Sequence, residues 1–185
     1  CIRDSYYAVS YLPGRVRADL FRNEAASKEQ DVVAALAKGP DSLPEALAHL
    51  NDTAALLEKA KQSSPCDYRI YLDLAETYHQ LYARMNSLPE EKRDENKAEN
   101  CFGKAVENYG ICISLFPLAH SAFNGLALLY ASRKDAGSIE RAIEAGEKAL
   151  GVYPVRPGYH LLLGNLYARR YSTARDERDR RKMFY

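Results

Sequence analysis

The sequence has no tryptophan, and it has only four cysteines and two methionines among its 185 residues. It also lacks an excess of charge, because 26 basic and 25 acidic residues give a formal net charge of +1. This balance excludes the basic surface expected of a nucleic-acid-binding protein or of a polybasic membrane-binding protein. No apolar run approaches the roughly 20 residues that a transmembrane helix needs. With 46% hydrophobic and 28% charged residues, the composition is that of a folded globular chain.

The cysteines offer no metal or redox motif. There is no C-x-x-C pair and no histidine at metal-ligand spacing, so we expect no metal and no cofactor. Cys101 and Cys112, if they share a helix, lie about 16 Å apart along it, too far for a disulfide. We therefore interpret the cysteines as small apolar side chains in a reducing compartment, although a disulfide between Cys1 and Cys66 stays open.

What the sequence does contain is a pattern that recurs around three prolines, Pro65, Pro117 and Pro154. Each proline closes a segment with helical apolar periodicity, and another such segment follows it. The residues that lie 12, 8 and 5 positions before each proline are Thr53, Leu57 and Ala60, then Ala105, Tyr109 and Cys112, then Ala142, Gly146 and Ala149. The outer two positions are small in every copy, which predicts closely packed helices.

A second pattern follows each proline. The three segments read Tyr71-x-x-Leu74-Ala75-x-x-Tyr78, Phe123-x-x-Leu126-Ala127-x-x-Tyr130 and His160-x-x-Leu163-Gly164-x-x-Tyr167. Spacings of three, four and seven place these residues on one face of a helix. A small residue between two large ones on that face leaves space for a neighbouring helix.

These residues resemble the tetratricopeptide repeat, a helix–turn–helix unit of about 34 residues with the pattern W-x₂-L-G-x₂-Y, A-x₃-F and P. The resemblance covers Tyr71–Pro117, Phe123–Pro154 and the half unit His160–Tyr167, and Thr53–Pro65 is similar to the second helix of an earlier unit. Tyr, Phe and His replace the tryptophan. The resemblance implies an all-α, right-handed superhelical solenoid of stacked antiparallel helix pairs, with about 7–8 helices in all.

The expected boundaries follow the prolines. Residues 1–13 are predicted as an irregular lead-in, and residues 14–185 as a single domain of this repeat type. Within that domain we expect a divergent first unit at 14–65, a unit with a long insertion at 66–117, a regular unit at 118–154 and a truncated last unit at 155–185. Arg15–Lys38 is read as one helix or two before a break at Gly39-Pro40, and Arg175–Tyr185 as the second helix of the last unit.

The insertion accounts for the 52 residues between Pro65 and Pro117, eighteen more than the repeat period. It lies across 85–100 and has two interpretations, a polar loop or a lengthened helical hairpin. Ser87-Leu88-Pro89-Glu90 matches a capping box, and the same tetrapeptide occurs at Ser42-Leu43-Pro44-Glu45. We therefore favour the hairpin, with a second helix from Leu88 to Leu115.

No catalytic constellation is present in the sequence. It contains no phosphate-binding loop, dinucleotide fingerprint, H-E-x-x-H or nucleophile elbow. His49, His79, His120 and His160 are scattered over different predicted helices, and His160 occupies the position of a large aromatic residue, which favours packing over ligation. We expect a non-enzymatic chain.

The candidate binding surface is the concave groove that such a solenoid offers. The resemblance implies that the first helix of each pair lines it, and the candidate residues are Arg69, Leu72, Glu76, His79, Gln80, Asn124, Leu128, Leu161, Asn165 and Arg169. Some members of the family hold the terminal carboxylate of chaperone tails with Lys and Asn. That clamp is absent, because Glu76 and Leu128 occupy matching positions and Leu161 precedes Asn165.

The leading hypothesis is a protein–protein interaction scaffold that binds a peptide or protein segment in this groove, with no nucleic acid and no membrane contact. Seven basic residues against three acidic ones within Arg169–Lys182 are interpreted as an interleaved helix face.

Two further hypotheses remain. The chain starts at Cys1, so it is read as a piece of a longer protein, and the alternative is the soluble C-terminal repeat region of a bacterial membrane glycosyl polymerase or ligase for O-antigen. Catalysis would then lie outside these residues. A cytoplasmic location is favoured for the chain itself, and tethering to a bacterial inner membrane through a missing part of the protein belongs to this alternative. The other hypothesis is self-association through the uncapped solenoid ends.

Overall fold

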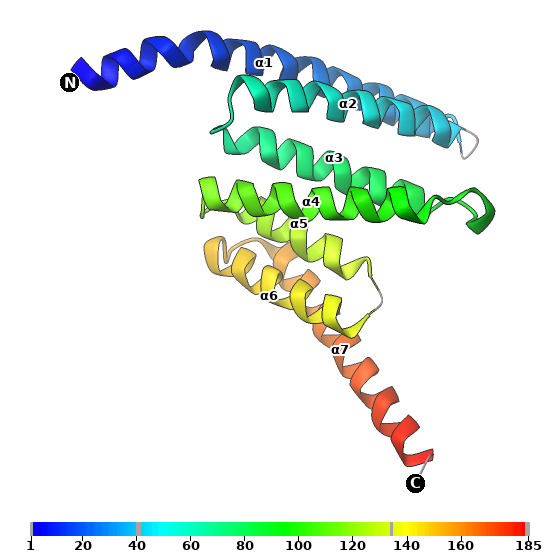
Figure 1. Cartoon of the computed structure of the whole chain (residues 1–185). Coiled ribbons are helices and arrows are strands. Elements are labelled where there is room, and N and C mark those ends of the chain that lie inside the picture. Colours follow the sequence, from blue (N-terminus) through cyan, green and yellow to red (C-terminus); the bar gives the residue numbers. More distant parts are fainter. Residues whose placement is uncertain (1, 40–41, 134, 184–185) are drawn as a thin grey trace. The chain divides into compact units, whose positions relative to one another are not determined.

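The computed structural model describes residues 2–39, 42–133 and 135–183, and its side chains over 14–39, 42–133 and 135–173. The described ranges contain seven α-helices and no strand (Figure 1). The helices are α1 (Ile2–Ala37), α2 (Leu43–Ser63), α3 (Tyr68–Asn86), α4 (Glu95–Leu115), α5 (His120–Ala131), α6 (Ala136–Val152) and α7 (Pro157–Met183). The chain divides into two compact units, unit 1 (Cys1–Leu115) and unit 2 (Phe116–Tyr185). The expected all-α architecture of helix pairs is confirmed.

In each unit, helices that follow one another in the chain pack side by side. In unit 1, α1 packs on α2, α2 on α3 and α3 on α4, and in unit 2 α5 packs on α6 and α6 on α7. All nine positions counted back from the prolines are buried, from Thr53 at 0% exposure to Gly146. The outer two positions of each set hold small residues, which let helices approach closely.

The first helix is longer than the sequence predicts. α1 begins at Ile2, so an irregular lead-in over 1–13 is wrong for residues 2–13. An internal proline such as Pro13 removes one hydrogen bond and bends a helix without having to end it, and α1 is curved in Figure 1. A Cβ on Gly14 would lie 2.5 Å from the carbonyl oxygen of Ser63, so only glycine lets α1 pass this close to the end of α2.

α1 ends at the predicted break. Gly39 has a φ of 112°, a left-handed conformation that favours glycine, and its N–H donates to the carbonyl of Leu36 at 3.3 Å. Pro40 lies outside the described residues. Residues 15–37 therefore belong to one helix rather than two.

The insertion lengthens both helices of the α3–α4 hairpin. α3 has 19 residues against 12 in α5, and α4 has 21 against 17 in α6. Between α3 and α4 the chain forms a 3₁₀ turn at Glu90–Lys92. The lengthened hairpin is thus present, but its second helix begins at Glu95, and the expected start at Leu88 is wrong.

The two Ser-Leu-Pro-Glu tetrapeptides differ in outcome, because α2 does begin at Leu43 whereas α4 begins at Glu95. The Ser87 hydroxyl donates to the carbonyl of Arg84 at 2.7 Å, and the Ser42 hydroxyl donates to the carbonyls of Ala35 and Gly39. Each serine therefore bonds the carboxyl end of the preceding helix, and Ser42 makes no capping bond to the N–H groups of α2.

α7 is a single helix to Met183. The expectation of a separate second helix at Arg175–Tyr185 is wrong over residues 175–183. The reason is local, because no proline or glycine occurs between Asn165 and Met183 to end the helix.

Candidate interaction surface

The open face of α3 carries the first group of candidate residues. The opposite side of α3 is packed, with Ile70, Leu74 and Leu81 at 1% exposure or less. Leu72 and His79 are half-buried, and the remaining candidates on this helix reach solvent. The candidate positions recur at spacings of three and four, so they share one face. Their side chains are Arg69, Leu72, Glu76, His79 and Gln80.

Ion pairs connect this side of α3 to α1. Arg22 Nε lies 2.7 Å from Asp73 Oδ2, and Arg69 Nη2 lies 3.5 Å from Asp19 Oδ1. Both first helices of unit 1 therefore border the same surface. Because solvent screens ion pairs that are partly exposed, each of these two pairs contributes at most about 1 kcal/mol to stability.

Arg69 is committed to the start of α3. Its Nε and Nη2 donate to the two carboxylate oxygens of Asp67 at 2.9 and 2.6 Å, and its backbone N–H donates to Asp67 Oδ1 at 3.1 Å. Burial opposes ionisation of Asp67, but these hydrogen bonds prevail and hold its pKa below the usual value. Arg69 thus stabilises the N-terminus of α3 instead of presenting a free charge.

The acidic groups of this surface influence one another. Glu76 reaches solvent, but the surrounding protein partly desolvates its carboxyl group, which raises the pKa. The negative charges of Asp73 and Glu29 raise this pKa further. Burial and the charge of Asp73 likewise raise the pKa of Glu29. Burial lowers the pKa of His79, which favours its neutral form. The unit 1 face is therefore weakly acidic and partly apolar.

Unit 2 carries the other candidates on α5 and α7. Leu128 is 44% exposed and Leu161 is 68% exposed, and Asn165 is exposed beside Leu161 on α7. Asn124 is half-buried on α5. Exposed leucines and amides side by side provide apolar contact together with hydrogen-bonding groups for a bound chain.

Arg169 has a structural role that the sequence did not indicate. Its Nη1 and Nη2 donate to the carbonyls of Ala131 and Arg133 at 2.6 and 3.1 Å. The last carbonyls of a helix lack internal partners, and a cation there also complements the helix dipole. Arg169 therefore joins α7 to the end of α5, and like Arg69 it is not free to bind a partner.

Two of the three aromatic positions after the prolines make a hydrogen bond that the sequence did not reveal. Tyr71 donates its hydroxyl to the carbonyl of Pro65 at 2.8 Å, and His160 Nε2 lies 2.8 Å from the carbonyl of Pro154. Because a carbonyl only accepts, Nε2 of His160 carries the proton. His160 is exposed, so the expectation that it is a packed residue is wrong. Its side chain is held by this hydrogen bond instead of by packing.

The difference arises because no second helix covers α7 in the described residues. Ala75 on α3 and Ala127 on α5 are both fully buried, whereas a Cβ on Gly164 of α7 would contact nothing within 4 Å. Tyr171 on the same helix is 64% exposed. Self-association through such an end stays a prediction.

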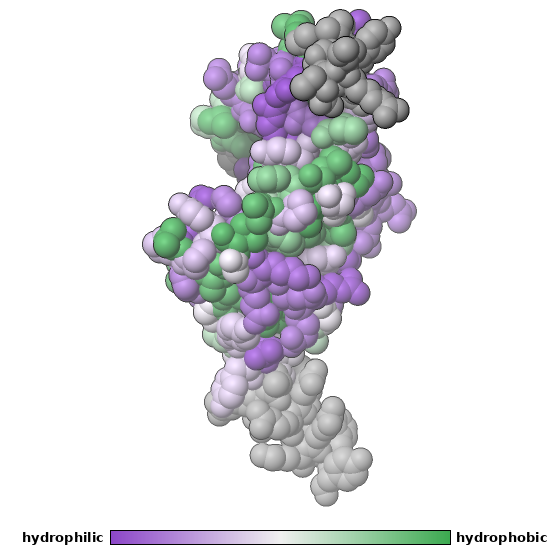
Figure 2. Space-filling view, turned by 90° about the vertical axis from the view of Figure 1, so that its left-hand side faces the viewer, coloured by the Kyte–Doolittle hydropathy of each residue, from purple (hydrophilic) through white to green (hydrophobic). Residues whose placement is uncertain are grey.

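The turns at one end of unit 2 form a further apolar surface. Figure 2 faces this end, and hydrophobic side chains are visible there. Leu118 is 62% and Val155 73% exposed, and Tyr153 stacks on His120 with ring centroids 5.0 Å apart. His120 Nδ1 also lies 2.7 Å from the Tyr159 hydroxyl. This surface competes with the helix faces as a possible contact region.

The described residues include free thiols and dispersed metal-ligating side chains. They contain no group of three or more His, Cys, Asp or Glu side chains placed to hold a metal ion. Cys101 and Cys112 are buried free thiols, as predicted, whereas Cys66 is exposed. Burial raises the pKa of Cys112 to about 11, which disfavours its reactive thiolate. None of the described helices is long and apolar enough to span a bilayer.

Comparison with solved structures decides the fold. The first TPR of Spaghetti (RPAP3), solved with the HSP90 peptide SRMEEVD, is similar to this chain with a TM-score of 0.59 at 12% identity, covering 83% of this chain and 93% of that one. MamA is similar with a TM-score of 0.51 at 17% identity, covering 91% and 90%. The chain has a tetratricopeptide-repeat fold. No family model matches the sequence, and no curated protein matches it either.

Proposed function

We propose that this chain is a non-enzymatic tetratricopeptide scaffold that binds a peptide or protein segment through the open faces of its first helices. The observation that carries the proposal is the pair of exposed leucines, Leu128 and Leu161, beside amide side chains on those faces. Both leucines keep a large exposed area, 44% for Leu128 and 68% for Leu161, that packing within the described residues leaves uncovered. The peptide bound to the similar Spaghetti domain supports a binding role for the fold.

The side chains divide into supporting and binding groups. Arg69 and Arg169 support the helices, as their hydrogen bonds show. The proposed contacts are therefore Leu72, Glu76, His79 and Gln80 in unit 1, and Asn124, Leu128, Leu161 and Asn165 in unit 2. The described surface has no lysine at the positions of a carboxylate clamp, so we expect a partner that is held by its backbone and apolar side chains rather than by its terminal carboxylate.

The test is a triple variant, Leu72→Ser, Asn124→Ala and Asn165→Ala, compared with wild type in affinity capture followed by mass spectrometry. We expect the polypeptides retained by wild type to be lost while helicity is retained, because Asn165 is exposed and Leu72 and Asn124 are only half-buried. A control variant, Gln62→Ala with Val155→Ser, changes exposed residues away from these faces and should retain the partners. Capture that survives the triple change, or is lost in the control, contradicts the assignment.

The alternative hypothesis, a region of a bacterial membrane polymerase or ligase for O-antigen, stays a prediction. The sequence encoded upstream of Cys1 decides it, since about ten apolar segments of roughly 20 residues would support it and their absence would eliminate it.

A further inference from the structure

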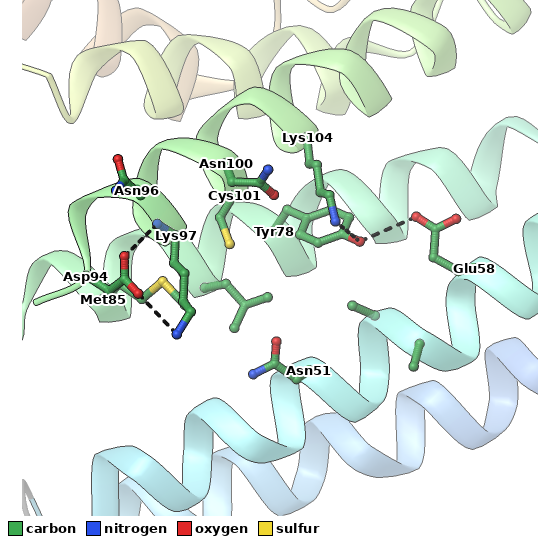
Figure 3. A pocket seen from close by; sticks show the side chains of 13 residues that line it. Asn51, Glu58, Tyr78, Met85, Asp94, Asn96, Lys97, Asn100, Cys101 and Lys104 are labelled. Carbon is green, nitrogen blue, oxygen red and sulfur yellow. Dashed lines mark hydrogen bonds and ion pairs between the residues drawn. The ribbon is translucent and has the colours of Figure 1, made fainter.

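A pocket of about 660 Å³ lies within unit 1 between α2, α3 and α4 (Figure 3). On α3 it is lined by Tyr78, Leu81 and Met85, whereas the proposed contacts on α3 include Leu72, Glu76 and His79. These two sets lie on different sides of the helix, because residues spaced by three and four share a face. The pocket is therefore separate from the proposed interaction surface. Its volume falls within the range of small-ligand sites in proteins.

The insertion builds one end of this pocket. Met85, Asp94, Asn96, Lys97 and Asn100 all line it, and all lie in the segment 85–100 that a repeat of ordinary length lacks. The shorter α5–α6 hairpin offers no equivalent positions. The extra residues thus do more than lengthen the hairpin, since they enclose space against α2.

Local hydrogen bonds hold this end of the pocket in place. Arg93 Nη2 donates to the carbonyls of Asn86 and Leu88 at 3.0 Å each. Asp94 Oδ1 accepts from the backbone N–H of Lys97 at 3.0 Å, and the Asp94 and Lys97 side chains form an ion pair at 3.1 Å. The rim is preorganised, which lowers the entropy cost of binding a ligand.

The floor of the pocket is apolar and its rim carries amides. Leu81 and Ala54 are 1% and 6% exposed, and the flexible Met85 side chain lies beside them. Asn51 on α2 faces the gap that Asn96 and Asn100 border on α4 (Figure 3). Amide side chains both donate and accept, which matches the alternating groups of a peptide backbone.

Lys104 is the charged side chain of the pocket without an ionic partner in the described part of the chain. Its Nζ lies 4.9 Å from the centroid of the Tyr78 ring and 3.5 Å from the Tyr78 hydroxyl. Glu58 is already paired with Lys61 at 3.5 Å and accepts from the Tyr78 hydroxyl at 3.4 Å. Glu107, one turn further along α4, forms no ion pair with Lys104 among the described residues. The ammonium group is therefore available to an incoming anion.

We propose that this pocket binds an extended peptide segment that carries a carboxylate side chain next to an apolar one. The carboxylate contacts Lys104, the apolar side chain packs on Leu81 and Met85, and the peptide backbone bonds the rim amides. The proposal does not depend on the function proposed above, because it uses other faces of the helices.

The two methionines make a direct assay possible, since Met85 lines the pocket and Met183 lies at the end of α7 in the other unit. Protein labelled with ¹³C at the methionine methyl groups is titrated with acetylated, amidated tetrapeptides Gly-Glu-Z-Gly, in which Z is Leu, Met, Val or Phe. We expect a saturable shift of the Met85 methyl resonance with at least one peptide and no shift of Met183.

Variants locate the contacts. Lys104→Gln keeps an unbranched stem and a polar end, one atom shorter than in lysine, but removes the charge. It should weaken binding by about tenfold or more, as expected for loss of a charge-assisted hydrogen bond. The matched control, Lys59→Gln, changes an exposed lysine of α2 outside the pocket and should bind like wild type. The triple variant of the interaction surface should also bind the peptide normally, which separates the two proposals.

Several outcomes overturn the proposal. They are an unmoved Met85 resonance at millimolar peptide, equal binding of peptides with Gln or Lys in place of Glu, and equal binding by Lys104→Gln. If acetate alone shifts Met85 as strongly as the peptides do, the pocket holds a small anion and the peptide assignment is wrong. Circular dichroism of each variant verifies that it is folded.

Discussion

The α3–α4 and α5–α6 hairpins follow one sequence pattern, but they differ in the size of the side chain at one shared position. Eight residues before its proline, α4 has Tyr109, which is 1% exposed, whereas α6 has Gly146. A Cβ on Gly146 would meet Leu163 Cδ2 of α7 at 3.0 Å. Periodicity therefore determines which face is buried, while side-chain volume determines how closely the next element can approach.

The largest expected effect comes from removing the large side chain of Tyr109. Tyr109→Ala leaves a cavity in unit 1 and should lower the free energy of unfolding by about 3–5 kcal/mol, as for large aromatic truncations in cores. Urea unfolding followed by circular dichroism measures it. Tyr109→Phe retains the ring and serves as control, and an equal loss in both variants would show that ring volume is not the cause.

The converse change adds a large side chain at Gly146. Gly146→Leu places a branched side chain against Leu163 and should destabilise unit 2 by about 1–3 kcal/mol, the usual cost of overpacking. Gly110→Leu in α4 is the matched control, because a Cβ on Gly110 has nothing within 4 Å. If Gly146→Leu unfolds at the same urea concentration as wild type, the close approach of α6 and α7 is not maintained.

A smaller difference concerns the bond to the repeat proline. Tyr71→Phe removes the hydroxyl that donates to the carbonyl of Pro65 in a buried setting, and should cost about 1 kcal/mol. His160→Ala removes the equivalent bond on exposed α7 and should cost less, below about 0.5 kcal/mol. Thermal unfolding of both variants compares them, and the reverse order would contradict the account.

The smallest effect depends on pH. Asp135 accepts from the N–H and hydroxyl of Ser138 at 2.8 and 2.7 Å at the start of α6, and these bonds lower its pKa. A lowered pKa means that the stabilisation is present above the ordinary pKa of 3.8 and is lost as pH falls through the lower native value. Melting curves between pH 2 and 7 should show a smaller acid-induced decrease for Asp135→Asn than for wild type. Parallel curves would rule out this contribution.

The sequence predicted what periodicity controls. The nine positions before the prolines, the helix pairs and the turns after them follow from apolar spacing and from prolines that cannot continue a helix. It failed where one side chain has two possible partners. The Ser87 hydroxyl bonds the end of α3 and α4 begins only at Glu95, whereas the same tetrapeptide at Ser42 does precede the start of α2 at Leu43.

The candidate site shows the same division. Which residues of α3 face outward could be predicted from spacing. The hydrogen bonds of Arg69 to Asp67 could not, because they depend on side-chain rotamers, and those of Arg169 to the end of α5 could not, because they are tertiary contacts. The pocket against α2 was also missed. The polar segment 85–100 was its signal, but only the fold places that segment beside Asn51.

The central claim, that partners bind the open faces of the first helices, is tested most directly by site-specific photo-crosslinking. A photoreactive phenylalanine analogue replaces Leu128, Leu161 or, as the competing surface, Val155, all of which are exposed. The account predicts that a partner polypeptide crosslinks at Leu128 and Leu161 and not at Val155. Crosslinking at Val155 alone would place the contact at the turns and contradict the claim.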